Sequence, residues 1–114
     1  MSTRIFRYSV REPSFSLIKN GLKKIEGRLY KNTFCEINNG DLINFYNKKN
    51  NFTIKVIKVT KYKNFKDMLV DNGINIVTPL SKSLDESLSI YRNIYTVKDE
   101  EKYGVIAIEL DKIL

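Results

Sequence analysis

Residues 52–62 carry the longest strand pattern in the chain, and this pattern restricts how the chain can fold. Phe52, Ile54 and Val56 alternate on one parity, whereas Ile57 falls on the other. A β-bulge near Val56 would restore the alternation on both sides, because a bulge adds one residue to one strand of a pair. Bulges bend strands and occur at the corners of small barrels, so the pattern predicts a curled sheet. An irregular strand buried on both faces at this point is the alternative.

Shorter segments supply the other predicted elements. Alternating apolar residues predict further strands in residues 6–10, 24–30, 42–47 and 104–110. Capping residues and apolar positions at helical spacing predict helices in residues 13–20, 64–71 and 83–95. Strands and helices do not alternate regularly, so we expect an α+β fold. Its predicted form is a curled antiparallel or mixed β-barrel of about five to six strands with about three helices.

Length and composition bound the class of protein. The 114 residues fit one domain, residues 1–114. No apolar run approaches the roughly 18 residues of a membrane span, and the first residues are too charged for a secretory signal, so we expect an intracellular, cytoplasmic protein.

With no histidine and one cysteine, Cys35, the chain cannot form a zinc site, a histidine-based triad or an internal disulfide. We expect no metal, no cofactor and no membrane partner, and Cys35 is predicted to be a buried, inert thiol.

Positive charge is concentrated in the first part of the chain. Residues 1–66 hold 15 Lys and Arg against 4 Asp and Glu, whereas residues 67–114 hold 5 against 9. Clustered cations bind phosphates by releasing their counterions, so this asymmetry suggests an anionic partner such as RNA. A solvated, lysine-rich surface without a partner is the alternative.

Residues 20–30 combine a helix end with a charged strand. Gly21 can end the preceding helix in a left-handed conformation, and the strand that follows places Glu26 and Arg28 on one face, with Lys23 at the turn before them. Such a cluster could recognise a base edge or a phosphate of a nucleotide, or it could be a network of ion pairs that braces the fold. Ser14, at the start of the first helix, is predicted to cap it or to bind an anion.

Aromatic residues interleaved with lysines form a second candidate set. Bases of a single strand stack on aromatic rings beside a cationic strip, so we predict RNA contacts for Tyr95, Tyr103, Lys58 and Lys61. Tyr91 lies four residues before Tyr95 on a predicted helix, and we expect it to belong to the core.

Five motifs, in order along nearly the whole chain, resemble the ASCH (ASC-1 homology) domain, a member of the PUA-like superfamily. They are Glu12-Pro13, Gly21-x-Lys23-x-x-Glu26-x-Arg28, Asn39-Gly40-Asp41-x-Ile43-x-Phe45, Tyr62-x-x-Phe65, and Ile94-Tyr95 followed by Glu100-Glu101-Lys102-Tyr103-Gly104-Val105. The resemblance implies a PUA-like fold in which the positions matching Lys23, Glu26 and Arg28 line a ligand cleft.

Some ASCH proteins are amidohydrolases that deacylate N4-acetylcytidine with a lysine, a threonine nucleophile and a carboxylate. Lys23 matches that lysine, but Glu26 stands where the threonine would be, and Asp85 and Glu86 are the acidic residues nearest to the position of the carboxylate. A carboxylate is a far poorer acyl acceptor than a hydroxyl. The resemblance therefore implies a ligand cleft, whereas the hydroxyl nucleophile that deacylation uses is not found at Glu26.

We therefore expect binding of RNA or a nucleotide-like ligand in a cleft lined by Ser14, Lys23, Glu26 and Arg28. In an open cleft Glu26→Gln would leave the fold intact. Two alternatives remain: a hydrolase acting on a modified nucleoside or on RNA, with Lys23 and Glu26 as catalytic candidates, and a protein-interaction adaptor that uses the acidic part of the chain. Neither the oligomeric state nor the identity of the ligand follows from the sequence.

Overall fold

The computed structural model describes residues 4–114, so the first three residues of the predicted domain lie outside the described residues. This part of the chain contains five strands, five α-helices and one 3-10 helix, η1. The strands are β1 (Ile5–Ser9), β2 (Ile25–Leu29), β3 (Leu42–Tyr46), β4 (Asn51–Tyr62) and β5 (Val105–Ile113). The helices are α1 (Ser14–Lys19), η1 (Asn32–Cys35), α2 (Phe65–Asn72), α3 (Ile74–Val77), α4 (Leu84–Arg92) and α5 (Val97–Tyr103).

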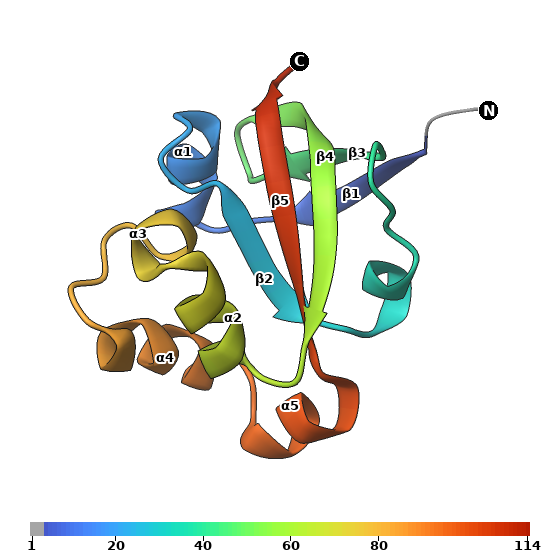
Figure 1. The fold of residues 1–114 in the computed structure, drawn as a ribbon. Helices are drawn as coiled ribbons and strands as arrows, with labels where there is room; N and C mark the ends of the chain where they lie inside the picture. The colour runs from blue at the N-terminus through green and yellow to red at the C-terminus, as the bar shows by residue number, and fades with distance from the viewer. Residues whose placement is uncertain (1–3) are drawn as a thin grey trace.

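The strands form one mixed, curled sheet with the order β1-β3-β4-β5-β2. Strands β1 and β3 pair in parallel, and the other three pairs are antiparallel. The sheet is a half-barrel whose two edges are β1 and β2, and helices α2, α3 and α4 lie beside β2 (Figure 1). The prediction of a curled mixed sheet in an α+β fold is confirmed.

The bulge predicted in the long strand is present. The register of β4 against β5 shifts between Ile54 and Val56 and again between Val56 and Lys58. As a result Val56 is fully buried whereas Ile57 is 45% exposed. The bulge lets β4 pair with β3 through its first half and with β5 through most of its length, which a straight strand in a strongly curled sheet could not do.

Each face of the sheet covers its own apolar core. The inner face, with Ile43, Ile54 and Ile108, packs against α1. The outer face, with Leu29 and Val105, packs against α2 and α4 through residues such as Phe65 and Met68. Strand β2 contributes to both faces, because its side chains alternate between them.

More helices form than the three predicted. The predicted first and second helices correspond to α1 and α2, with Gly21 and Gly73 in positive-φ conformations at their ends. The predicted third helix, however, ends at Arg92, and a further helix, α5, begins after Thr96, whose side chain accepts a hydrogen bond from the Asp99 N–H. A Thr-x-x-Asp cap at this position was a sequence signal for α5.

Cys35 does not occupy the buried position that was predicted for it. It lies in η1 (Asn32–Cys35) and its side chain is exposed. The apolar residues around it belong to a short 3-10 turn, which cannot bury consecutive side chains in the way that a central strand does. None of the helices in residues 4–114 has the length and apolar character needed to span a bilayer.

Candidate functional site

A cleft of about 290 Å³ opens between the first turn of α1, the loop that follows α3, and helix α4. Its walls are mainly apolar, and polar side chains enter from three sides. The residues that line it are Pro13, Ser14, Leu17, Lys23, Val77, Thr78, Pro79, Leu80, Ser81, Ile90, Tyr91 and Ile94. A few polar groups in an apolar cleft are typical of small-ligand sites, because the walls supply contact area and the polar groups supply orientation.

Lys23 is the charged side chain of this cleft, and it is only 4% exposed. Its ammonium group donates a hydrogen bond to the backbone carbonyl of Val77 and lies 3.6 Å from Oε1 of Glu26. Burial lowers the pKa of Lys23, and the Glu26 carboxylate opposes this effect. The ammonium group is thus held between α3 and β2 rather than projecting freely into solvent.

Glu26 joins two cations. Its Oε1 faces Lys23, while its Oε2 accepts hydrogen bonds from Nε and Nη2 of Arg28 at 3.2 and 3.0 Å. Burial alone would lower the pKa of Arg28, but the Glu26 carboxylate and the nearby tyrosine hydroxyls raise it overall. Glu26 is 7% exposed, and neither it nor Arg28 is among the residues that line the cleft. A role for these two residues in ligand binding therefore stays a prediction.

Arg28 also connects the two edges of the half-barrel. Its Nη2 donates a hydrogen bond of 3.2 Å to the carbonyl oxygen of Ser9 in β1, although Arg28 itself belongs to β2. Its guanidinium carbon lies 5.2 Å from the centre of the Phe34 ring. The charge cluster has a structural function here, since it fills the gap between two strands that do not pair with each other.

Hydroxyl groups make up the remaining polar surface of the cleft. The Thr78 hydroxyl lies 2.6 Å from that of Ser87, which is fully buried and does not line the cleft, and the two hydrogen-bond to each other. The Ser81 hydroxyl is buried, and no group within the described residues forms a hydrogen bond with it. A buried polar group without a partner is unfavourable by about 1–3 kcal/mol, and because this oxygen has almost no accessible surface, it would have to turn toward the cleft to bond a ligand.

Sequence reasoning did not identify Thr78 and Ser81. The segment 78–81, Thr-Pro-Leu-Ser, links two helices, and a turn with two hydroxyl groups was the available signal.

Ser14 and the two helix tyrosines take different positions. Ser14 lines the cleft, but its side chain does not cap α1, because Pro13 is the cap residue and the Glu12 carboxylate accepts a hydrogen bond from the Ser16 N–H of the first turn. Tyr91 is 4% exposed and stacks on Phe65 at 4.2 Å, which confirms that it belongs to the core. Tyr95 is half-buried and stacks on the same ring at 5.4 Å. Burial raises the pKa of Tyr95, and the nearby Arg28 cation opposes this effect without reversing it.

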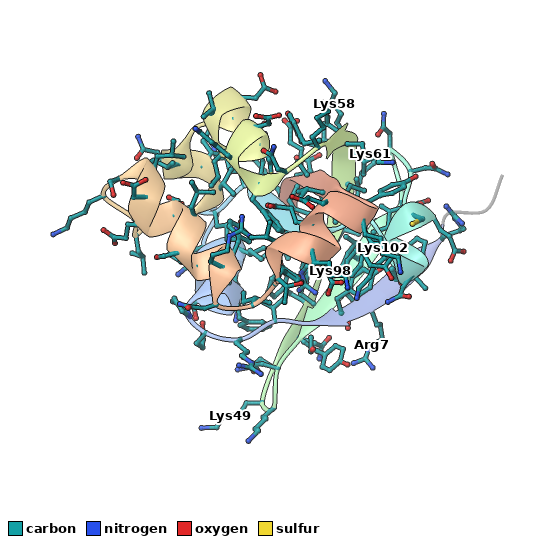
Figure 2. All side chains as sticks on the ribbon, turned by 90° about the horizontal axis from the view of Figure 1, so that it is seen from below. Arg7, Lys49, Lys58, Lys61, Lys98 and Lys102 are labelled. Atoms are coloured by element: carbon teal, nitrogen blue, oxygen red, sulfur yellow. The ribbon has the colours of Figure 1, made fainter. Side chains whose placement is uncertain are left out.

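The structure separates the predicted basic strip. Lys58 and Lys61 differ in parity on β4, so they project to opposite faces of the sheet. Lys61 and Tyr103 do come together, because both line a shallow depression that also includes Lys63 and Lys102. Figure 2 shows Lys58 and Lys61 projecting from β4 and Lys98 and Lys102 from α5.

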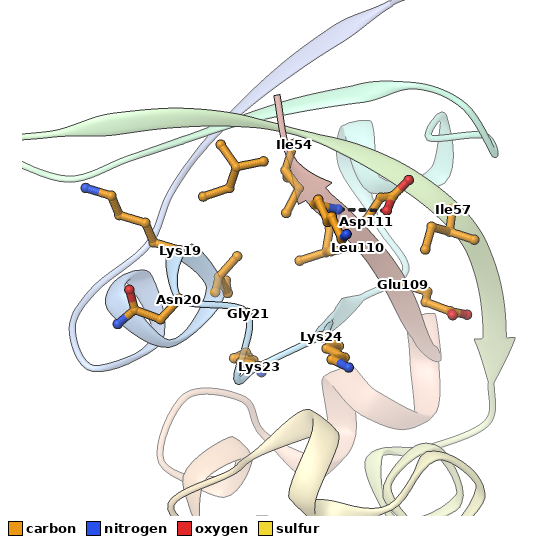
Figure 3. Close-up of a pocket in the computed structure, with 13 residues that line it drawn as sticks. Lys19, Asn20, Gly21, Lys23, Lys24, Ile54, Ile57, Glu109, Leu110 and Asp111 are labelled. Carbon is orange, nitrogen blue, oxygen red and sulfur yellow. Dashed lines mark hydrogen bonds between the residues drawn. The ribbon is translucent and has the colours of Figure 1, made fainter.

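A second groove, of about 590 Å³, borders Lys23 on the side away from α4 (Figure 3). Ile54 and Leu110 contribute apolar surface to it, and Lys19, Lys24 and Glu109 are among the charged residues that line it. Because charges of both signs surround apolar residues, this groove favours no single class of ligand, whereas the hydroxyl groups of the cleft can orient a polar ligand.

The fold defines the class of protein: a curled, mixed, PUA-like sheet with α2, α3 and α4 beside its β2 edge (Figure 1). The model of the ASCH domain matches residues 9–114, so the chain belongs to the ASCH domain family. This confirms the resemblance noted in the sequence.

Two solved structures are similar over almost their full length. The crystal structure of hypothetical protein PH0355 has a TM-score of 0.89 and 40% sequence identity, covering 96% of this chain and 99% of that one. The solution NMR structure of protein PF0455 from Pyrococcus furiosus has a TM-score of 0.79 and 37% identity, covering 96% and 97%. A comparison with curated proteins gave no match.

Proposed function

We propose that this protein binds RNA or a nucleotide-like ligand and that a base of the ligand occupies the cleft beside Lys23. The observation that carries the proposal is the unpartnered, buried hydroxyl of Ser81 in a cleft that also holds a buried ammonium group. A flat ring would fill the space between the apolar walls, such as Leu17 and Ile90, while its carbonyl and amino groups bond to Lys23 and Ser81.

Glu26 and Arg28 lie outside the cleft and hold the Lys23 side chain in position. The carboxylate fixes the position of the Lys23 ammonium group, and Arg28 fixes the carboxylate with two hydrogen bonds. The Lys23 side chain is therefore already ordered before a ligand binds. Ordering a flexible lysine side chain costs up to about 2 kcal/mol of conformational entropy, and binding does not have to supply it here.

The proposal is tested with isotope-labelled protein and a set of free nucleosides and nucleotides. We expect cytidine, uridine or adenosine, or one of their monophosphates, to shift NMR signals of residues 78–81 and of Lys23. Ser81→Ala should weaken that binding about tenfold, the equivalent of one hydrogen bond. Ser89→Ala is the matched control, because Ser89 is exposed on α4 and its hydroxyl bonds only to the helix backbone. Shifts confined to surfaces outside the cleft would contradict the proposal.

A hydrolase acting on a modified nucleoside is the second candidate, and the lowered pKa of Lys23 favours it, because a deprotonated lysine can accept a proton. Glu26, however, offers no hydroxyl nucleophile and holds a positive charge on Lys23 by direct ion pairing. We therefore expect little or no release of cytidine from N4-acetylcytidine. Rapid release that is lost in both Lys23→Met and Ser81→Ala would instead show that hydrolysis takes place in the cleft.

A further inference from the structure

A group of aromatic and basic side chains lies at the opposite end of β2 from the cleft. We call it the basic–aromatic patch, and its residues are Tyr30, Lys31, Lys61, Lys63, Lys102 and Tyr103. They come from the residues after β2, from the C-terminal end of β4 and the residue after it, and from α5. The hydrogen bond from the Tyr30 N–H to the Gly104 carbonyl, at 2.9 Å, joins two of these segments.

Three of the four lysines of the patch, Lys31, Lys61 and Lys102, hold their ammonium groups over aromatic rings rather than against carboxylates. The ammonium nitrogen of Lys61 lies 4.3 Å from the centre of the Tyr30 ring, and those of Lys31 and Lys102 each lie 5.2 Å from the centre of the Tyr103 ring. Of the salt bridges formed within residues 4–114, none involves a lysine of the patch. These charges are therefore positioned by cation–π contacts and are free to pair with an external anion.

A depression of about 390 Å³ lies within the patch. Lys61, Lys63, Lys102 and Tyr103 line it together with a single carboxylate, that of Glu101. Lys98 precedes Lys102 by one helical turn and adds a further cation on α5, next to Asp99 (Figure 2). The excess of cations therefore favours an anion with several charges.

The residue types in the patch favour one class of anionic partner over the others. The exposed large apolar side chains of residues 4–114 all lie outside it, so it lacks the groups that insert into a lipid surface. Aromatic rings beside lysines match an unpaired nucleic-acid strand, whose bases stack on rings while its phosphates pair with the cations. An acidic peptide would use the lysines but leave the rings without a comparable partner.

We propose that the basic–aromatic patch is a docking surface for single-stranded RNA, so that the protein binds a strand and not only a free nucleotide. This inference deepens the proposed function and rests on it for the choice of RNA. The residues between Lys23 and Lys31 include β2 and span roughly 25 Å at the rise of a strand. One strand of several nucleotides could therefore contact the patch while one of its bases enters the cleft, with Arg28 and Tyr95 between the two.

The experiment measures the affinity for fluorescent oligouridylates of one to eight nucleotides as a function of salt. Lys61→Gln combined with Lys102→Gln should weaken the octamer about tenfold at 0.1 M salt and should reduce the slope of log affinity against log salt by about 1.4, since each phosphate contact contributes about 0.7 on a single strand. Lys48→Gln combined with Lys49→Gln removes the same charge from the exposed β3–β4 loop and should leave both quantities nearly unchanged.

The outcomes separate the two proposals. Wild-type octamer affinity in the Lys61/Lys102 variant, with mononucleotide shifts still present in the cleft, would overturn the docking surface and leave the proposed function standing. Loss of octamer binding in that variant, with no cleft shifts in the wild type, would support the patch and overturn the cleft. Competition by polyglutamate as strong as that by oligouridylate would show a general anion surface and would also overturn the inference.

Discussion

At the scale of single residues, the structure shows Glu26 as the shared counter-charge of Lys23 and Arg28 rather than as a group in an open cleft. We expect Glu26→Gln to destabilise the fold by about 3 kcal/mol, because it leaves Lys23 and Arg28 without their shared counter-charge in a largely buried position. This replaces the expectation that the fold would be unaffected, which assumed an open cleft. Urea unfolding of the single variant and of Glu26→Gln combined with Arg28→Met measures the effect. If the two changes simply add, the residues do not act as one network.

Lys23 makes stability depend on pH in a particular direction. Its pKa in the folded state lies below the ordinary value of 10.5, so between these two values the unfolded chain binds more protons than the folded chain. Stability contributed by this residue therefore rises with pH through that window. We expect the stability of the wild type, relative to that of Lys23→Met, to increase as the pH approaches 10.5.

The comparison between variants is necessary because burial raises the pKa of Tyr91, which makes every variant lose stability at higher pH. Lys24→Met is the matched control, since Lys24 is the exposed neighbour of Lys23. Thermal unfolding from pH 7 to 10.5 measures the stability difference between the wild type and Lys23→Met, and that between the wild type and Lys24→Met. A flat difference for Lys23→Met would mean that the buried ammonium group keeps its ordinary pKa.

At the scale of elements, the contact between β2 and α2 depends on the absence of a side chain at Gly27. A Cβ at this position would lie 2.8 Å from Sδ and 2.9 Å from Cε of Met68, and 3.2 Å from the Tyr91 hydroxyl. Met68 is fully buried, so its flexible end has no space into which it can move. We expect Gly27→Ala to destabilise the protein by about 1–3 kcal/mol through overpacking.

The cause is checked with a second substitution. Met68→Val shortens the side chain that the added methyl group would contact, so the double variant should recover part of the stability lost in Gly27→Ala, as measured by urea unfolding. Equal losses in the single and double variants would place the cause in the backbone of β2 instead.

The elements also show what the sequence could and could not predict. The bulge in β4, the cap at Asn64 and the helix stop at Gly21 were predictable because local patterns determine them. Alternation in β2 indicated which residues share a face with Glu26, but not that Arg28 would extend to β1 and cover that face. The turn at residues 78–81 was a local signal for Ser81, but its missing hydrogen-bond partner was not predictable, since that is a property of packing between distant segments.

At the scale of the whole molecule, Arg28 connects the two free edges of the half-barrel. We expect Arg28→Lys to destabilise the protein by about 1–2 kcal/mol, because an ammonium group cannot bond to Glu26 and to the Ser9 carbonyl as the forked guanidinium does. Amide hydrogen exchange of β1 should become faster.

Arg92→Lys is the control for that experiment, since Arg92 pairs with Glu100 and does not contact β1. It should lower stability without a selective change in the exchange of β1. If Arg28→Lys also leaves β1 exchange unchanged, the edges are held together by the apolar core instead.

The strand order β1-β3-β4-β5-β2 has a consequence for biosynthesis. On the ribosome β1, β3 and β4 are complete well before β5, so a three-stranded sheet can form early. Strand β2 cannot take its place then, because its neighbour in the sheet is β5, and Leu29 pairs with Val105. At roughly 5–20 residues per second, translation leaves β2 unpaired for roughly 4–15 s. We therefore expect Lys23 and the charged residues of β2 to stay hydrated during that interval, and Lys23 and Glu26 to become buried only when β5 emerges and the sheet is completed.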